Sequence, residues 1–308
     1  MAAEEVIQKA LADLRQATGL DLALKSSPAG EAASVADGLR RLALAYREKY
    51  NKIHFLQSLL TGRVPSYHVQ DRARRLHIDP EEARVLYLME TGSSLDELLL
   101  EVLKGLFPAR SDTYLIPVSA NLEAVLCPLR TKSGVSPEES CFSLARTIVD
   151  TMNTEAFTRV RVSYSRSFHS LLDLSSAFQE ASLALKVGGL FLSEQTVFPY
   201  NRLGIGRLIY RLPGDLCENF LREIFGDEIP EALDAETAVT AAQFFQNNLN
   251  IAETARQLHV HRNTLIYRLE QIQHRTGLDL RNFEDAATFK IASMVINYLA
   301  TERNSAHE

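Results

Sequence analysis

The stretch LNIAETARQLHVHRNTLIYRLEQIQHRTGLDLR, residues 249–281, decides the fold of the C-terminal region. It predicts two helices joined by a tight turn at His259. Ala255 allows the helices to approach closely, Val260 fills the corner between them, and a stripe of apolar residues at helical spacing begins at Leu265. This spacing is typical of a helix-turn-helix, in which the second helix lies in the major groove of DNA.

The opposite face of the second helix is polar from its first turn. We expect Arg262 and Asn263 to contact base edges, because a guanidinium can pair with guanine and a carboxamide with adenine. Ile266 and Tyr267 are expected to face the groove wall. Thr264 is also a candidate helix cap. The residues expected to hold phosphate or to orient the helix are His261, Thr264, Arg268 and Arg275.

Charge distinguishes this stretch from the rest of the chain. Five arginines stand against three acidic residues, a formal net charge of +2 with three histidines neutral, whereas the whole chain carries −6 and the remainder therefore −8. Positive charge on a groove-reading geometry favours DNA binding over an amphipathic helical hairpin in an all-α core, which the same apolar spacing could form. His259 occupies a turn position that favours glycine, because it needs a positive φ.

The segments VHRNTLIYRLEQI (260–272) and TGLDL (276–280) resemble the C-terminal helix-turn-helix of PucR/CdaR-type bacterial transcriptional regulators. The resemblance continues more weakly back to Tyr46. It implies a degenerate GGDEF-like domain before the DNA-binding domain, a small-molecule effector, and activation of a catabolic operon. The turn position of that family is often not glycine, which accommodates His259. Ser163 stands where the family commonly has glycine, in a segment that could contact an effector.

Composition excludes several other classes of protein. The 308 residues are 46% hydrophobic and 23% charged, as in soluble globular proteins. No apolar run is long enough to span a membrane, and the N-terminus is acidic where a signal peptide is basic, so we expect a cytoplasmic protein without a membrane partner. Cys127, Cys141 and Cys217 lack a CxxC spacing and are expected to be buried thiols, with no metal and no cofactor.

The N-terminal region predicts helices at 3–18 and 34–61, with a strand-like segment at 20–25 between them. The longer helix carries an apolar stripe at 4-3-4 spacing, consisting of Val35, Leu39, Leu42, Tyr46, Ile53, Leu56 and Leu60. The stripe could form a parallel coiled coil or cover the helix's own domain. A homodimer has independent support, because a single helix-turn-helix rarely contacts enough bases of double-stranded DNA.

The middle region alternates between strands and helices in the order βαββαβ, followed by αβ. Strands are predicted at 83–91, 112–119, 122–129, 159–165 and 196–200, and helices at 93–107, 136–156 and 175–186. This order predicts a ferredoxin-like core with one extra unit, with parallel strand pairs made through crossover helices. The predicted fold class is therefore an α+β multidomain protein, with an N-terminal helical segment or coiled coil, a GGDEF-like middle domain and an all-α helix-turn-helix bundle.

The expected domain boundaries follow from this order. An N-terminal helical segment covers 1–65, the GGDEF-like domain 66–200, two linker helices and an acidic stretch 201–236, and the DNA-binding domain 237–308. Gly188 and Gly189 are expected to stop the helix before the last strand.

The DNA-binding bundle should include two further helices. The first, at 237–247, is expected to turn Val239, Ala242 and Phe245 toward the core. The last, at 283–299, is expected to be capped by Asn282.

Two other functions remain open beside that of a DNA-binding transcriptional regulator. Nucleotide cyclases share the middle-domain order, and the middle domain could be a cyclase-like enzyme or an effector-binding module. The hairpin 119–123, at the position of a cyclase signature, has neither a glycine pair nor adjacent acids for Mg²⁺, so we expect no catalysis. A sequence-tolerant architectural DNA binder is the other alternative, and the acidic remainder of the chain argues against it.

Overall fold

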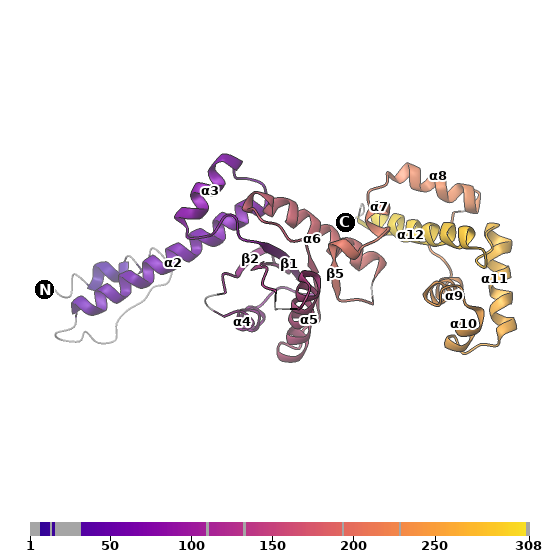
Figure 1. Ribbon diagram of the computed structural model, residues 1–308, viewed down its shortest axis with the longest axis horizontal. Helices are drawn as coiled ribbons and strands as arrows, with labels where there is room; N and C mark the ends of the chain where they lie inside the picture. Colours follow the sequence, from indigo (N-terminus) through magenta and orange to yellow (C-terminus); the bar gives the residue numbers. More distant parts are fainter. Residues whose placement is uncertain are drawn as a thin grey trace. The chain divides into compact units, whose positions relative to one another are not determined.

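The computed structural model describes residues 7–12, 14–15, 32–108, 111–131, 134–192, 194–227 and 229–305. The chain divides into two compact units, Met1–Ser182 and Leu183–Glu308, and Figure 1 gives the order of the elements. Residues 7–12 and 14–15 are helical, whereas the predicted strand-like segment at 20–25 lies outside the described residues. Among the described residues, no helix has both the length and the apolar character needed to cross a membrane.

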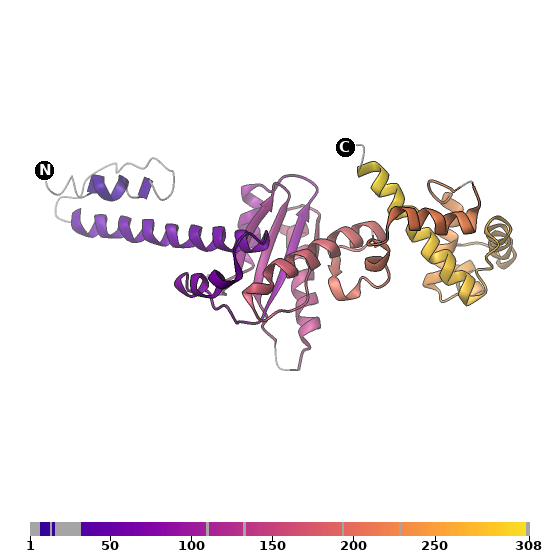
Figure 2. The same ribbon diagram turned by 90° about the horizontal axis from the view of Figure 1, so that it is seen from above.

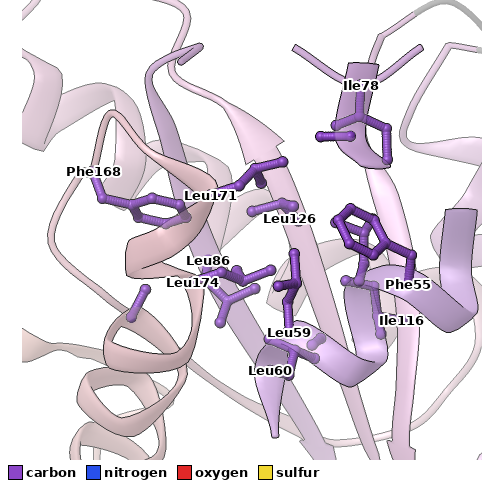
Figure 3. Packing of buried hydrophobic residues seen from close by; sticks show 14 of the residues in the cluster. Phe55, Leu59, Leu60, Ile78, Leu86, Ile116, Leu126, Phe168, Leu171 and Leu174 are labelled. Atoms are coloured by element: carbon purple, nitrogen blue, oxygen red, sulfur yellow. The ribbon is translucent and has the colours of Figure 1, made fainter. Parts of the chain in front are cut away.

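The long predicted helix is present as α2 (Ala32–Leu60), and its two halves have different surroundings. Leu56 and Leu60, at the end of the predicted stripe, are buried in the core of the first unit. Figure 3 shows Leu60 there together with Phe55. The first half of α2 projects beyond the sheet (Figure 2). There Leu39 packs against residues of the helical segment 7–12, and Leu42 is 56% exposed. The second half of the stripe therefore covers its own domain, and a coiled coil through the first half stays a prediction.

The middle elements follow the predicted order. The strands are β1 (Arg84–Thr91), β2 (Tyr114–Ser119), β3 (Leu122–Pro128), β4 (Val160–Tyr164) and β5 (Val197–Pro199). The helices are α3 (Ser66–Arg75), α4 (Glu97–Gly105), α5 (Pro137–Glu155) and α6 (Leu174–Phe191), with a 3-10 turn η1 (Leu171–Asp173) before α6. The α+β class is thus confirmed.

The pairing among the strands β1 to β4 differs from the prediction of parallel pairs. The strand order is β2-β3-β1-β4-β5, and β1 pairs antiparallel with both β3 and β4, as β2 does with β3. For example, Tyr87 of β1 lies opposite Val125 on one side and Tyr164 on the other. The crossovers through α4 and α5 each join two strands with one further strand between them, whereas α6 joins the neighbouring strands β4 and β5. The crossovers through α4 and α5 interleave in this way, and the strands β1 to β4 have the ferredoxin-like order with antiparallel neighbours.

Side chains of the sheet alternate between two apolar faces. Leu86 and Leu126 lie on the face that packs against α2 and the start of α6, where Leu174 joins them (Figure 3). Tyr87 points to the other face, where its hydroxyl donates to the carbonyl of Cys141 in α5 over 3.4 Å. Cys141 and the other two cysteines of the chain are buried free thiols, as predicted.

α5 begins where the sequence predicts because Ser136 and Glu139 form a capping box. The Ser136 Oγ accepts a hydrogen bond from the backbone N–H of Glu139, and the Glu139 carboxylate accepts one from the N–H of Ser136, each over 3.1 Å. Pro137 occupies the first helical position, where it has no hydrogen bond to lose.

The second unit is helical apart from β5 and contains two apolar clusters. After the end of α6 and β5, its elements are a 3-10 turn η2 (Tyr200–Arg202), α7 (Gly206–Ile209), α8 (Gly214–Phe225), α9 (Ala235–Gln246), α10 (Ile251–Gln257), α11 (Arg262–Thr276) and α12 (Phe283–Ser305). Phe289 of α12 belongs to the cluster of α9, α10 and α11, whereas Val295 and Leu299 belong to the cluster of α7 and α8. The helix α12 therefore connects the two clusters. As predicted, Asn282 caps α12, since its side chain accepts from the N–H of Glu284 over 3.0 Å.

The predicted helix stop at Gly188 and Gly189 is wrong, because α6 continues through both residues to Phe191. A Cβ atom at position 188 would lie 2.2 Å from ring atoms of Phe198 in β5. The missing side chain lets the strand residue pack directly on the helix backbone. Close approach, and not helix termination, explains the glycine at 188.

The predicted inner face of the first bundle helix is shifted by one residue. In α9 the buried residues are Thr240, Ala241 and Phe244. Val239 is 55% exposed, Ala242 is exposed, and Phe245 is only partly buried at the edge of the cluster. Alanine and threonine weaken the apolar contrast between adjacent faces in this helix, so the pattern allowed a neighbouring register.

Candidate nucleic-acid interface

The turn between α10 and α11 has the geometry that the sequence predicts. His259 has a φ of 55°, and its neighbour Val260 donates its backbone N–H to the carbonyl of Ala255 over 3.0 Å. Ala255 is buried beside Leu265, and Val260 packs partly buried on the same cluster. The left-handed residue at position 259 lets the chain turn sharply between the end of α10 and the start of α11. This backbone conformation costs a histidine more conformational free energy than it would cost a glycine.

A polar network that helical spacing does not indicate fixes α10 against α9. The side-chain amide of Asn247 donates to the hydroxyl of Thr254 over 3.2 Å and to Gln257 over 3.3 Å. Gln243 of α9 also donates to Gln257. Asn250 caps α10 by accepting from the N–H of Glu253 over 3.1 Å. The helix in front of the recognition helix is therefore held by side-chain hydrogen bonds as well as by apolar packing.

The first turn of α11 is exposed and is capped by His261. The His261 Nδ1 accepts a hydrogen bond from the backbone N–H of Asn263 over 3.2 Å. Thr264, the candidate cap, is exposed and is not the capping residue. Arg262 is exposed and forms no ion pair with any acidic side chain in the described part of the chain. Its guanidinium therefore lies at the positive end of a helix without a compensating carboxylate.

The buried and exposed faces of α11 divide as predicted. Leu265, Leu269 and Ile272 are at most 2% exposed, which places the opposite face outward. Tyr267 is 61% exposed on that outward face, and Ile266 is partly buried beside it.

Two of the predicted arginines already have partners within the bundle. Arg268 is paired with Glu236 over 2.9 Å, and Arg275 with Asp234 over 2.8 Å. Asp234 also caps α9, and the backbone N–H of Thr237, followed by Arg275, lowers the pKa of its carboxyl group. Arg268 and Arg275 thus tie α11 to the start of α9. Their predicted contacts with phosphate stay a prediction.

The hairpin between β2 and β3 has no pair of acids on one face. Glu123 is buried, and burial raises its pKa to about 7, with Lys104 acting in the opposite direction. Glu90 lies opposite Leu122 in the sheet, so it points to the other face from Glu123, and it is paired with Arg161. The described residues contain no group of three His, Cys, Asp or Glu side chains that could hold a metal ion.

Ser163, at the position where glycine was expected from the family resemblance, has a structural partner. It is fully buried in β4, and its hydroxyl donates to the carbonyl of Ala181 in α6 over 2.7 Å. The serine therefore links the sheet to the helix that covers it.

Two domain families match this chain. Residues 238–295 match the PucR C-terminal helix-turn-helix domain, which includes α10 and α11. Residues 61–187 match the GGDEF-like domain, which includes β1 to β4.

Three curated proteins are similar to parts of the chain. The carbohydrate diacid regulator of Escherichia coli (strain K12) is 27% identical over 226 residues, 71% of this chain and 59% of the relative. The purine catabolism regulatory protein of Bacillus subtilis (strain 168) is 30% identical over 123 residues, 40% of this chain and 23% of the relative. The proline-responsive transcriptional activator PutR of the same organism is 24% identical over 198 residues, 62% and 47% of the two chains. The matches cover less than two thirds of each relative.

Proposed function

The chain belongs to the PucR/CdaR-type family, and from this premise we propose that it is a DNA-binding transcriptional regulator. In this proposal it acts as a homodimer on double-stranded DNA, responds to a small metabolite, and activates a catabolic operon. Three relatives that carry regulator or activator in their names support the class of function.

One observation carries the proposal more than any other. The first turn of α11 offers Arg262 and Asn263 outward, while the stripe that begins at Leu265 is buried. A guanidinium without an ion-pair partner and a free carboxamide at a helix N-terminus are the groups that recognise base edges. We assign base contacts to these two residues and the groove wall to Ile266 and Tyr267. His261, Thr264, Arg268 and Arg275 are proposed to contact phosphate or to orient the helix.

The remaining parts of the chain are assigned by the same proposal. The segment 1–65 serves dimerisation, and 66–200 forms the GGDEF-like domain. The segment 201–236 links this domain to the DNA-binding domain, 237–308. The matched segments 61–187 and 238–295 support two of these boundaries. We propose that the protein is not an enzyme and acts in the cytoplasm. Opposite orientation of the two sheet acids, Glu90 and Glu123, argues against a magnesium-dependent cyclase.

The test begins with selection of bound duplexes from a random pool by the full-length chain. The affinity of Arg262→Ala is then measured on the selected duplex and on a scrambled one. We expect a loss of about 1–3 kcal/mol on the selected duplex and little change on the scrambled one. Arg146→Ala, an exposed arginine of α5 in the other unit, is the matched control and should change neither affinity.

Equal losses on both duplexes would refute the assignment of Arg262 to base contact. Selection of no preferred duplex by the wild-type chain would favour the architectural DNA binder over the regulator. Formation of a cyclic nucleotide from GTP and Mg²⁺ would contradict the proposal that the protein is not an enzyme.

A further inference from the structure

A second basic segment lies far from the predicted DNA reader in sequence. Residues 63–75, RVPSYHVQDRARR, contain four arginines and one aspartate, a formal net charge of +3 with His68 neutral. The whole chain carries −6. The segment includes α3 and the turn that precedes it, and neither helix-turn-helix geometry nor the sheet requires its charge.

The charged side chains surround a hollow of about 430 Å³. His68, Arg72 and Arg75 follow one another at helical spacing and line it from one face of α3. Val69 and Ala73, on a neighbouring face of α3, are buried in the core of the first unit. Packing of that apolar face fixes which side chains α3 presents to the hollow.

Arg63 lines the same hollow from the turn before α3, together with Asp71 from the helix. The lining therefore has three arginines and one carboxylate, a formal net charge of +2 with His68 neutral. Two separate segments thus bring guanidinium groups toward one concavity. This is the arrangement in which a multivalent anion can accept paired hydrogen bonds from several directions.

The arginines of the hollow have no carboxylate partners in the described part of the chain. Elsewhere in the same unit Arg84, Arg161 and Arg166 are each paired with a glutamate. The guanidinium of Arg72 instead lies 5.1 Å from the centre of the Phe55 ring, which holds it in place. Helix dipoles favour arginines near the ends of α2 and α3, but they do not gather side chains from two segments around one space.

We propose that this hollow binds a small organic anion with at least two negative charges, a phosphate ester or a polycarboxylate, and that it is the effector site of the protein. The volume lies within the range of small-molecule sites, and the lining supplies the cations. The role as effector site rests on the proposed regulatory function, whereas binding itself does not.

The first unit has another hollow, of about 330 Å³, beside Tyr87 and Cys127. Its lining is largely apolar, and its arginine, Arg130, lies 3.9 Å from the carboxylate of Asp112. An anion there would have to displace an existing partner. The α3 hollow offers its arginines without that competition.

The test uses the full-length chain with pyrophosphate and citrate as separate probes, by isothermal titration calorimetry at constant ionic strength. The variant is Arg63→Gln/Arg75→Gln, which leaves Arg72 and its contact with Phe55 intact. The control is Arg146→Gln/Arg159→Gln, two exposed arginines without ion pairs in the described part of the chain. We expect the wild-type chain and the control to bind at least one probe, and the variant to bind it at least about tenfold more weakly. Unchanged circular dichroism and unfolding temperature would show that the exposed substitutions leave the fold intact.

Two results would overturn the proposal. The first is absence of binding of either probe by the wild-type chain, and the second is equal affinity of wild type and variant. In the first case, the variant is also measured on a scrambled duplex, and it could lose affinity there with a shallower dependence of that affinity on salt. That result would assign the surface to nucleic-acid phosphates.

Failure of the proposed function would be distinguishable from failure of this site. Arg262→Ala should bind the probe like the wild-type chain, because it alters only the DNA reader. Probe binding that depends on Arg63 and Arg75, without any DNA binding by the wild-type chain, would support the anion site and defeat the regulator.

Discussion

At the scale of single residues, the ion pair between Arg275 and Asp234 allows two roles of Arg275 to be separated. Asp234 caps α9 with one carboxylate oxygen and accepts from Arg275 with the other. Asp234→Asn keeps a good capping residue but removes the charge. We expect Arg275→Ala to weaken binding to selected and scrambled duplexes alike and to lower the slope of log affinity against log salt by about 1. Asp234→Asn should leave DNA affinity unchanged or higher.

The measurement is a salt titration of both variants on both duplexes. If Asp234→Asn reproduces the loss seen for Arg275→Ala, the arginine orients α11 and does not contact phosphate. Arg146→Ala again supplies the control for a general loss of positive charge.

Glu123 predicts a dependence of stability on pH. Burial raises its pKa from 4.5 to about 7 in the folded chain, so the folded state keeps a proton that the unfolded state releases. The contribution of Glu123 to the free energy of unfolding is therefore fully present below pH 4.5, and it falls as the pH rises toward 7. We expect the wild-type chain to lose roughly 2–3 kcal/mol of unfolding free energy over this interval through Glu123, and we expect Glu123→Gln not to show this loss.

Chemical denaturation of the wild-type chain and of Glu123→Gln at pH 5 and pH 8 would check this prediction. Glu101→Gln, at an exposed position of α4, is the control and should follow the wild type. Equal stability changes in the wild type and in Glu123→Gln between the two pH values would exclude Glu123 as the cause.

Some properties of single residues could be predicted from the sequence and others could not. The buried stripe of α11 and the exposed Arg262 follow from helical spacing within one segment. The partner of Arg275 lies 41 residues away, and nothing in local spacing indicates it. The basic hollow could not be predicted for a similar reason. Arg63 and Arg75 line the same hollow only because the turn between α2 and α3 brings them to one side.

At the scale of elements, Gly188 shows how a contact between a helix and a strand can determine a residue. A methyl group at 188 would overlap the Phe198 ring, which is itself fully buried. We expect Gly188→Ala to destabilise the second unit by about 3 kcal/mol, because neither the ring nor the helix backbone can move freely. Gly38→Ala in α2 should instead stabilise by up to about 1 kcal/mol, since nothing lies within 4 Å of its added Cβ.

Urea denaturation of the two glycine variants tests this contrast. Opposite signs would support steric packing at 188, whereas stabilisation by both substitutions would show that Phe198 can yield. The incorrect helix stop arose because glycine pairs often end helices, and the contact with Phe198 is made only in three dimensions. The extent and type of the other middle elements could be predicted, since each has its own apolar period, but strand direction depends on which strand lies between the crossovers.

At the scale of the whole molecule, the sequence predicted the order of the segments and the acidic balance against which the basic ones stand out. Residues 61–187 and 238–295 match separate domain families. The number of chains in the assembly is the remaining question at this scale. Periodicity alone allows two interpretations of the helix 34–61, a coiled coil between two chains or a helix that covers its own domain. Leu56 and Leu60 lie in the domain core, whereas Leu42 is exposed. The prediction of a dimer contact is therefore limited to the first half of α2.

Substitution of Leu42 tests that reading. If the first half of α2 pairs with its copy in a second chain, Leu42→Lys places a charge in the contact, and we expect dimers to dissociate at micromolar concentration by sedimentation velocity. The affinity for a duplex with two half-sites should fall when the dimer dissociates, because each DNA-binding domain then binds its half-site alone. Leu98→Lys, at a position that is 57% exposed on α4, is the matched control and should leave both measurements unchanged. A Leu42→Lys chain that remains dimeric and binds paired half-sites normally would place the dimer contact on another surface.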